Sequence, residues 1–201
     1  MLMIKNIIFD IGNVLMNFTW KPFIKSLFQD DETIKQVENA IWHTGLWNEL
    51  DRNVIPEAEI FARMRSFNPE YEPQVVLALE QVKSCYHKTD YAIPWIKELK
   101  AAGYKVYFLS NYSAFSQRNN PECLDFLPYM DGGVFSCDVQ HVKPDPFIYK
   151  EICRKYALQP AECIFMDDKL ENVEAARDCG MQALQFTGYE ETRAALKQLL
   201  E

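Results

Sequence analysis

The sequence predicts an α/β fold in which a parallel sheet carries helices on both faces and a mostly helical segment is inserted after the first strand. Two observations support the sheet: short apolar runs recur along the chain, and helical patterns separate them. A third observation supports the insertion, because residues 18–90 contain helical patterns without a convincing strand.

Five apolar runs are short and rich in Ile, Val and Phe, as is typical of strands buried on both faces. In chain order they cover residues 4–9, 106–109, 133–135, 163–166 and 183–186. The first four are followed by Asp10, Ser110, Ser136 and Asp167. Parallel strands end at a common edge, so these positions predict where a ligand would bind.

Three helices are expected between the later strands. The first covers residues 93–102, where apolar residues recur at helical spacing. The second begins with Asp145 as N-cap and Pro146 at the first helical position, and it continues to about residue 156. The third covers residues 170–179 and ends before a glycine.

Residues 18–90 are interpreted as a helical insertion. Apolar side chains recur there at helical spacing, as at Val76, Leu79, Val82 and Tyr86. Three prolines stand at plausible helix starts, at positions 22, 56 and 73.

Composition and charge exclude several classes of protein. The 201 residues carry a formal net charge of −8, which does not attract nucleic acid or an anionic membrane. No apolar run approaches the roughly 18 residues that span a bilayer, and Asp10 interrupts the N-terminal run too early for a secretory signal. The six cysteines lack compact spacing, so we expect reduced thiols in a soluble, cytoplasmic protein.

Polar residues at the predicted strand ends form the candidate site. They are Asp10, Ser110 with Asn111, Lys143 in a loop before a proline, and the pair Asp167–Asp168. Several carboxylates in a chain with only three histidines suit Mg²⁺, which prefers oxygen ligands. A lysine beside such a site indicates a dianion shared with the metal, and phosphate is the most common one.

Four motifs in this order resemble those of the haloacid dehalogenase superfamily of phosphotransferases. They lie at residues 9–15, 108–111, 142–144 and 165–172. The resemblance covers essentially the whole chain, and the four motifs together make it specific. It implies a Rossmann-like core domain of residues 1–17 and 91–201, with residues 18–90 as the small helical cap of the first capped subclass.

The resemblance implies roles in phosphoryl transfer for four residues. Asp10 would be the nucleophile that carries an aspartyl-phosphate, because a carboxylate is ionised at neutral pH and forms a hydrolysable acyl phosphate. Ser110 would hydrogen-bond the transferring phosphoryl oxygens, with Asn111 as a further contact. Lys143 would offset the repulsion between Asp10 and the incoming phosphate.

The resemblance also implies a Mg²⁺ site. One oxygen of Asp10, the backbone carbonyl of Gly12 and the carboxylate of Asp168 would be ligands, while Asp167 would orient metal-bound waters. Gly12 and the adjacent Asn13 are also counted among the residues that contact phosphate or substrate.

One position departs from the pattern of the family's phosphatases. They usually carry a second aspartate two residues after the nucleophile, which protonates the leaving alcohol, and here that position is Gly12. Loss of a general acid typically costs ~10²–10⁴ in rate. Two explanations stay open: a leaving group that needs less help, or an acid from the cap, for which the candidates are His43, Glu49 and Asp51.

The resulting hypothesis is a Mg²⁺-dependent phosphatase for a small phosphorylated metabolite. The Asp-x-Gly-Asn-Val form is similar to the branch with bacterial α-D-glucose-1-phosphate phosphatase, which favours a sugar phosphate such as a hexose 1-phosphate. Trp20 and Trp47 are the aromatic residues expected to contact it. The alternatives are a haloacid dehalogenase, a phosphomutase and a catalytically impaired binding protein, and the chain is expected to be a monomer or homodimer.

Overall fold

The core of the molecule is a parallel five-stranded sheet, which confirms the predicted fold class. The computed structural model describes residues 3–200. Across the sheet the strands are β5 (Gly132–Phe135), β4 (Lys105–Ser110), β1 (Asn6–Phe9), β6 (Cys163–Asp167) and β7 (Gln182–Gln185). All four strand pairs are parallel. β1 is central and fully buried, so the residue that follows it emerges at the middle of the sheet's carboxyl edge.

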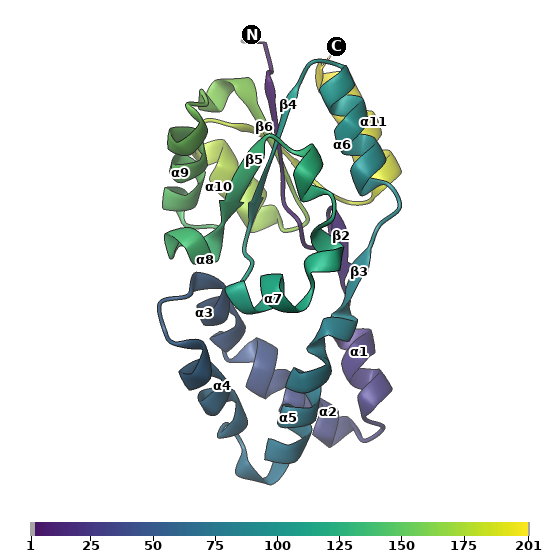
Figure 1. Cartoon of the computed structure of the whole chain (residues 1–201), viewed down its shortest axis with the longest axis vertical. Coiled ribbons are helices and arrows are strands. Elements are labelled where there is room, and N and C mark those ends of the chain that lie inside the picture. The colour runs from purple at the N-terminus through teal and green to yellow at the C-terminus, as the bar shows by residue number, and fades with distance from the viewer. Residues whose placement is uncertain (1–2, 201) are drawn as a thin grey trace.

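Helices cover both faces of this sheet (Figure 1). They are α6 (Ala92–Ala101) and α11 (Tyr189–Leu200) on one face, with α9 (Pro146–Tyr156) and α10 (Leu170–Asp178) on the other. Alternation along β1 explains the arrangement, because Ile7 packs in a cluster with Trp95 of α6 while Ile8 packs in one with Tyr149 of α9. The short helices α7 (Ala114–Asn119) and α8 (Ser136–Val139) follow β4 and β5.

The helix boundaries follow local sequence signals. Asp145 caps α9, its side chain accepting a hydrogen bond from the backbone N–H of Phe147 at 2.9 Å, and Pro146 is the first helical residue as predicted. Likewise α10 ends at Asp178, one residue before the predicted boundary.

A helical lobe, residues 19–85, lies at the carboxyl edge of the sheet and forms the lower half of Figure 1. It contains α1 (Trp20–Leu27), α2 (Asp31–Glu38), α3 (Leu46–Arg52), α4 (Glu57–Arg65) and α5 (Glu72–Gln81). Its interior is apolar and includes Ile24, Ile41 and Ile60, each with no exposed surface.

The expectation that residues 18–90 contain no strand is wrong at both ends of that segment. A two-stranded antiparallel sheet of β2 (Met16–Phe18) and β3 (Tyr86–Lys88) joins the lobe to the core. The helical pattern expected to reach Tyr86 stops earlier, because α5 ends at Gln81 and Tyr86 pairs with Phe18. His87 and Lys88 are exposed, so β3 lacks the apolar run that marks the strands of the core.

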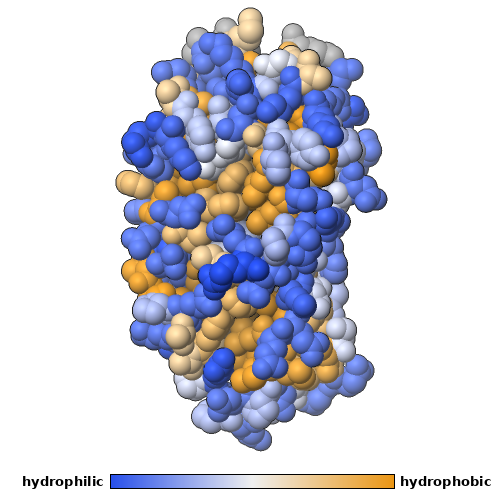
Figure 2. Space-filling model, viewed as in Figure 1, coloured by the Kyte–Doolittle hydropathy of each residue, from blue (hydrophilic) through white to orange (hydrophobic). Residues whose placement is uncertain are grey.

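The surface is mainly hydrophilic on the face drawn in Figure 2, with apolar side chains showing in patches over both halves. No helix among residues 3–200 is both long and apolar enough to cross a membrane. All six cysteines have free thiols and five are buried, as expected.

Candidate active site

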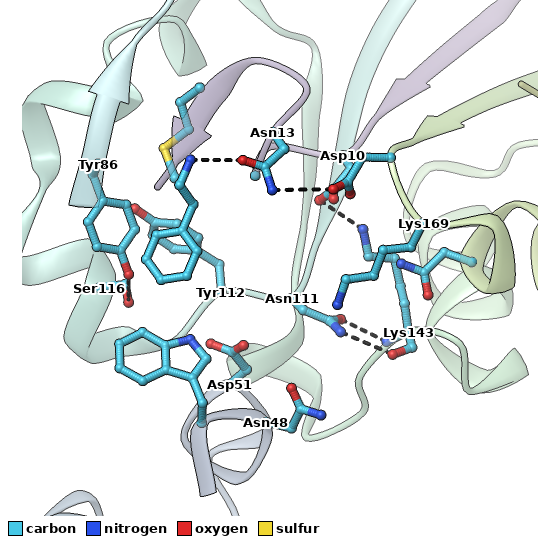
Figure 3. A pocket seen from close by; sticks show the side chains of 16 residues that line it. Asp10, Asn13, Asn48, Asp51, Tyr86, Asn111, Tyr112, Ser116, Lys143 and Lys169 are labelled. Atoms are coloured by element: carbon cyan, nitrogen blue, oxygen red, sulfur yellow. Dashed lines mark hydrogen bonds and ion pairs between the residues drawn. The ribbon is translucent and has the colours of Figure 1, made fainter. Parts of the chain in front are cut away.

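A pocket of about 130 Å³ lies between the carboxyl edge of the sheet and the helical lobe. The sheet side contributes residues that sequence reasoning selected: Asp10, Gly12, Asn13, Asn111, Lys143 and Asp168. The lobe side contributes Trp47, Asn48 and Asp51, all from α3. Figure 3 shows Asp10 and Lys143 close together, with Asp51 and Asn48 across the pocket from Asp10.

Asp10 follows β1 directly, and its backbone N–H donates to the carbonyl of Met166 on β6 at 2.8 Å. Two donors reach the same carboxylate oxygen, Oδ1: the backbone N–H of Ile11 at 2.7 Å and Nζ of Lys143 at 2.8 Å. Burial raises the pKa of Asp10 to about 7, although Lys143 opposes the shift. The site therefore holds a carboxylate whose charge depends on its cationic neighbours.

Lys143 lies between two carboxylates in the buried part of the site. Its Nζ is 2.8 Å from Oδ1 of Asp10 and 2.6 Å from Oδ2 of Asp167, and the residue is 4% exposed. Burial favours the neutral amine, but the two carboxylates outweigh it and raise the pKa of Lys143 above its usual value. The ammonium consequently stays charged.

Asn111 positions Lys143 through the backbone. Its Nδ2 donates to the carbonyl of Lys143 at 3.0 Å, and its Oδ1 accepts from the backbone N–H of Lys143 at 2.7 Å. Sequence reasoning assigned Asn111 to phosphate binding. In the structure both polar atoms of its side chain are engaged by Lys143, although the residue also lines the pocket.

The acidic pair after β6 divides into two environments. Asp167 is fully buried and accepts hydrogen bonds from Lys143, the backbone N–H of Lys169 and the Asn172 amide. Asp168 is half-buried, lines the pocket and accepts from Nδ2 of Asn13 at 3.2 Å. Burial, and then the charge of Asp167, raise the pKa of Asp168.

The donor set fits a divalent cation. Oxygens of Asp10, Asp167 and Asp168 lie within 4.8 Å of one another. Within residues 3–200, Lys143 is the one ammonium paired with these carboxylates, so with all three ionised the cluster carries −3 + 1 = −2. All of its donors are oxygens, which is the ligand type that Mg²⁺ prefers.

Three of the predicted residues do not line the pocket. One is Asp167, which is fully buried. Ser110 ends β4 and is 1% exposed. Trp20 stacks on Trp42 inside the lobe, with ring centroids 4.8 Å apart. Trp47, in contrast, stacks on Phe18 and contributes to the wall.

Of the three acids considered in the lobe, the structure brings Asp51 to the pocket. Glu49 pairs with Arg52 at 3.2 Å, and His43 lies edge-on against Trp20. Sequence reasoning missed Asn48, Tyr86 and Lys169 as lining residues. The spacing of Asn48 and Asp51, three residues apart on one helix face, was a usable signal, whereas Tyr86 gave none because β3 was not recognised.

The chain is similar to known hydrolases over almost its whole length. A family model described as haloacid dehalogenase-like hydrolase matches residues 4–180. The sesquiterpene phosphatase astK of Aspergillus oryzae is 28% identical over 98% of this chain and 96% of its own. The D-ribitol-5-phosphate phosphatase of Bacteroides thetaiotaomicron is 25% identical over 91% and 92% of the two chains.

A solved structure shares the fold at lower identity. An enzyme of the same family from Bacteroides thetaiotaomicron, crystallised with magnesium and inorganic phosphate, superposes with a TM-score of 0.69 at 22% identity, covering 90% of this chain and 93% of its own. The family model matches residues 4–180, and the sheet edge of the chain carries the expected acidic residues and lysine. This protein therefore belongs to the haloacid dehalogenase-like hydrolases.

Proposed function

We propose that this protein is a Mg²⁺-dependent phosphatase that hydrolyses a small phosphorylated metabolite through an aspartyl-phosphate on Asp10. The observation that carries the proposal is the buried ion-pair cluster: Lys143 lies between Asp10 and Asp167, with Asp168 open to the same pocket. Relatives along nearly the full chain are named phosphatases, which supports the reaction class.

Asp10 is the nucleophile in this proposal. Ile11 and Lys143 both bond its Oδ1, and no hydrogen bond from residues 3–200 falls on Oδ2, so Oδ2 is the oxygen available for attack. Lys143 offsets the charge of the incoming phosphate and of the equatorial oxygens in the transition state. We also assign Ser110, at the end of the neighbouring strand, to hydrogen bonding of the transferring phosphoryl oxygens, which requires its buried hydroxyl to become accessible when substrate binds.

Asp10, Asp168 and the carbonyl of Gly12 would hold Mg²⁺, while Asp167, already bonded by Lys143 and Asn172, keeps these groups in place. Bound there, Mg²⁺ supplies positive charge that neutralises the phosphate oxygens. We further propose that residues 18–90 act as a cap domain that excludes water from the attack step.

The lining of the pocket favours a compact polar substrate with one apolar face, such as a hexose 1-phosphate. Phe18, Trp47 and Tyr86 form an aromatic wall, and Asn48 and Asp51 offer hydrogen-bonding groups from the lobe. A volume of about 130 Å³ is below the ~300–1,000 Å³ of pockets for larger ligands. The aromatic wall would also contact a prenyl chain, the substrate class suggested by the name of the sesquiterpene phosphatase astK, but a chain of that length needs more room than this pocket offers.

The proposal is tested by phosphate release from a panel containing sugar 1-phosphates, terminal sugar and polyol phosphates, FMN and farnesyl phosphate. We expect turnover with Mg²⁺, none with a chelator, and none with Asp10→Asn. The matched control is Asp31→Asn, an exposed aspartate of α2, which should keep full activity. Release of halide from 2-haloacids, or Mg²⁺ binding without any turnover, would overturn the proposal.

A further inference from the structure

Asp51 lines the pocket from a helical turn that is held against the core. Asp51 lies in the last turn of α3 and is 6% exposed. Ser136 Oγ, from the core, donates to the backbone carbonyl of Asp51 at 2.6 Å. Nδ2 of Asn53 donates to the carbonyl of Cys137 at 3.4 Å. The lobe thus places this carboxyl at a fixed position relative to the sheet edge.

The Asp51 carboxyl is partly protonated near neutral pH. Burial raises its pKa to about 7, against the opposing effects of Lys169, the backbone of Ser113 and Lys143. No ion pair with Asp51 occurs within residues 3–200. A protonated carboxyl is a donor as well as an acceptor, and a pKa near the working pH is the optimum for proton transfer.

The other ionisable groups of the pocket are unsuited to proton donation on the lobe side. Asp10 and Lys143 form the cluster at the sheet edge, and Asp168 belongs to its metal-binding part. Lys169 also lines the pocket, but it is exposed to solvent. The hydroxyl of Tyr86 is 2.8 Å from that of Ser116, and burial raises the pKa values of Tyr86 and Tyr112 well above the usual value.

The direction of phosphoryl transfer selects the same residue. In an in-line displacement the leaving oxygen lies on the far side of phosphorus from the nucleophile. The nucleophile is at the sheet edge, so the leaving oxygen faces the lobe, where Figure 3 shows the Asp51 carboxyl. Position 12, two residues after Asp10, is glycine and supplies no proton.

We infer that Asp51 is the general acid and base of the proposed phosphatase reaction, an inference that rests on that proposed function. Asp10 Oδ2 forms a bond to phosphorus, the bond from phosphorus to the ester oxygen breaks, and that oxygen takes the Asp51 proton and leaves as the alcohol. Water then attacks phosphorus and gives a proton to the Asp51 carboxylate. The phosphorus–Asp10 bond breaks, its electrons return to Asp10, and inorganic phosphate leaves. Asp51 is then protonated again.

The test compares esters whose leaving groups differ in their need for a proton. p-Nitrophenolate departs as an anion, whereas an alkoxide such as that of a sugar or glycerol phosphate does not. Asp51→Asn should lower kcat/KM, which reports the steps up to phosphorylation of Asp10, by ~10²–10⁴ for the alkyl ester and by less than ~10 for p-nitrophenyl phosphate. Hydrolysis of the aspartyl-phosphate is common to both esters, so kcat alone does not separate them. Glu49→Gln is the matched carboxyl-to-amide control on the same helix, and it should leave both rates unchanged.

An equal loss of kcat/KM for the two esters in Asp51→Asn, or no loss for either, would overturn the inference. A second measurement uses the unaltered protein. Single-turnover phosphoryl transfer from the alkyl ester should slow in D₂O and that from p-nitrophenyl phosphate should not, and equal solvent isotope effects would contradict the assignment. Absence of Mg²⁺-dependent, Asp10-dependent hydrolysis of both esters would instead refute the proposed function, and the inference with it.

Discussion

Replacing Lys143 with methionine is expected to destabilise the fold as well as abolish activity. The ammonium lies 2.8 Å from Asp10 and 2.6 Å from Asp167. With an effective dielectric constant of about 20, each pair is worth about 6 kcal/mol of Coulomb energy. Much of this only offsets the cost of burying the charges, and breaking such a buried pair costs a net ~3–5 kcal/mol.

The loss in Lys143→Met should grow with pH. Without the ammonium, the pKa of Asp10 rises above the value of about 7 that it has in the parent, so the folded variant keeps a proton that the folded parent releases. The parent and the variant lose stability together from the ordinary carboxyl pKa up to about pH 7, and above that pH only the variant continues to lose it. The difference between them should therefore be nearly constant below about pH 6 and grow above about pH 7.

The assay is thermal or urea unfolding in chelator, across this pH range. A loss of ~3–5 kcal/mol corresponds to a fall in Tm of roughly 6–20 °C for a chain of this size. Lys88→Met is the control, because Lys88 contacts Asp125 at the same 2.6 Å but both side chains are largely exposed, so its Tm should barely change. A small, pH-independent loss in Lys143→Met, equal to that of the control, would refute the reasoning.

Three further outcomes are expected. Asp51→Asn should gain stability relative to the parent as the pH rises. Asp51 binds its proton more tightly in the folded than in the unfolded protein, so the parent loses up to about 1.4 kcal/mol of stability per pH unit between the pKa of Asp51 in the unfolded chain and about 7. A pH-independent difference in Tm would contradict this. Mg²⁺ at 100 times its dissociation constant should stabilise the protein by about 2.7 kcal/mol, and Asp168→Asn should remove most of that shift in Tm, so an undiminished shift would exclude Asp168 as a ligand. Gly133→Ala should lower the free energy of unfolding by about 1–3 kcal/mol, because the added Cβ would overlap the ring of Phe108. In Gly12→Ala the added Cβ meets no atom within 4 Å, so the free energy of unfolding should change by less than about 0.5 kcal/mol. Similar unfolding midpoints for the two variants would be inconsistent with the packing.

The core sheet was predictable because its strands are buried on both faces. Burial of β1 and β6 produces continuous apolar runs that local sequence reveals directly. β2 and β3 were not predictable in this way. Their pairing joins Phe18 to Tyr86 across the whole lobe, and the exposed His87 and Lys88 give no apolar pattern.

The sheet side of the site was also predictable, because strand ends of a parallel sheet converge whatever the loops do. Asp10 and Asp168 reach one pocket for that reason. The role of Asn111 was not predictable in this way, because its side-chain amide bonds the backbone of Lys143 only when two separate loops are in place. On the lobe, tertiary packing determines which aromatic ring faces the pocket, so Trp47 lines it while Trp20 does not.

The chain enters and leaves the helical lobe through two strands that pair with each other. Because Met16 pairs with Lys88, the ends of the lobe are neighbours, and its whole length is inserted at one point of the core. Residues added, lost or exchanged between β2 and β3 therefore leave the strand order and the carboxyl ends of the five core strands untouched. Such a junction allows the lobe side of the pocket to be replaced as one unit, in evolution or by design, while the residues at the sheet edge stay unchanged.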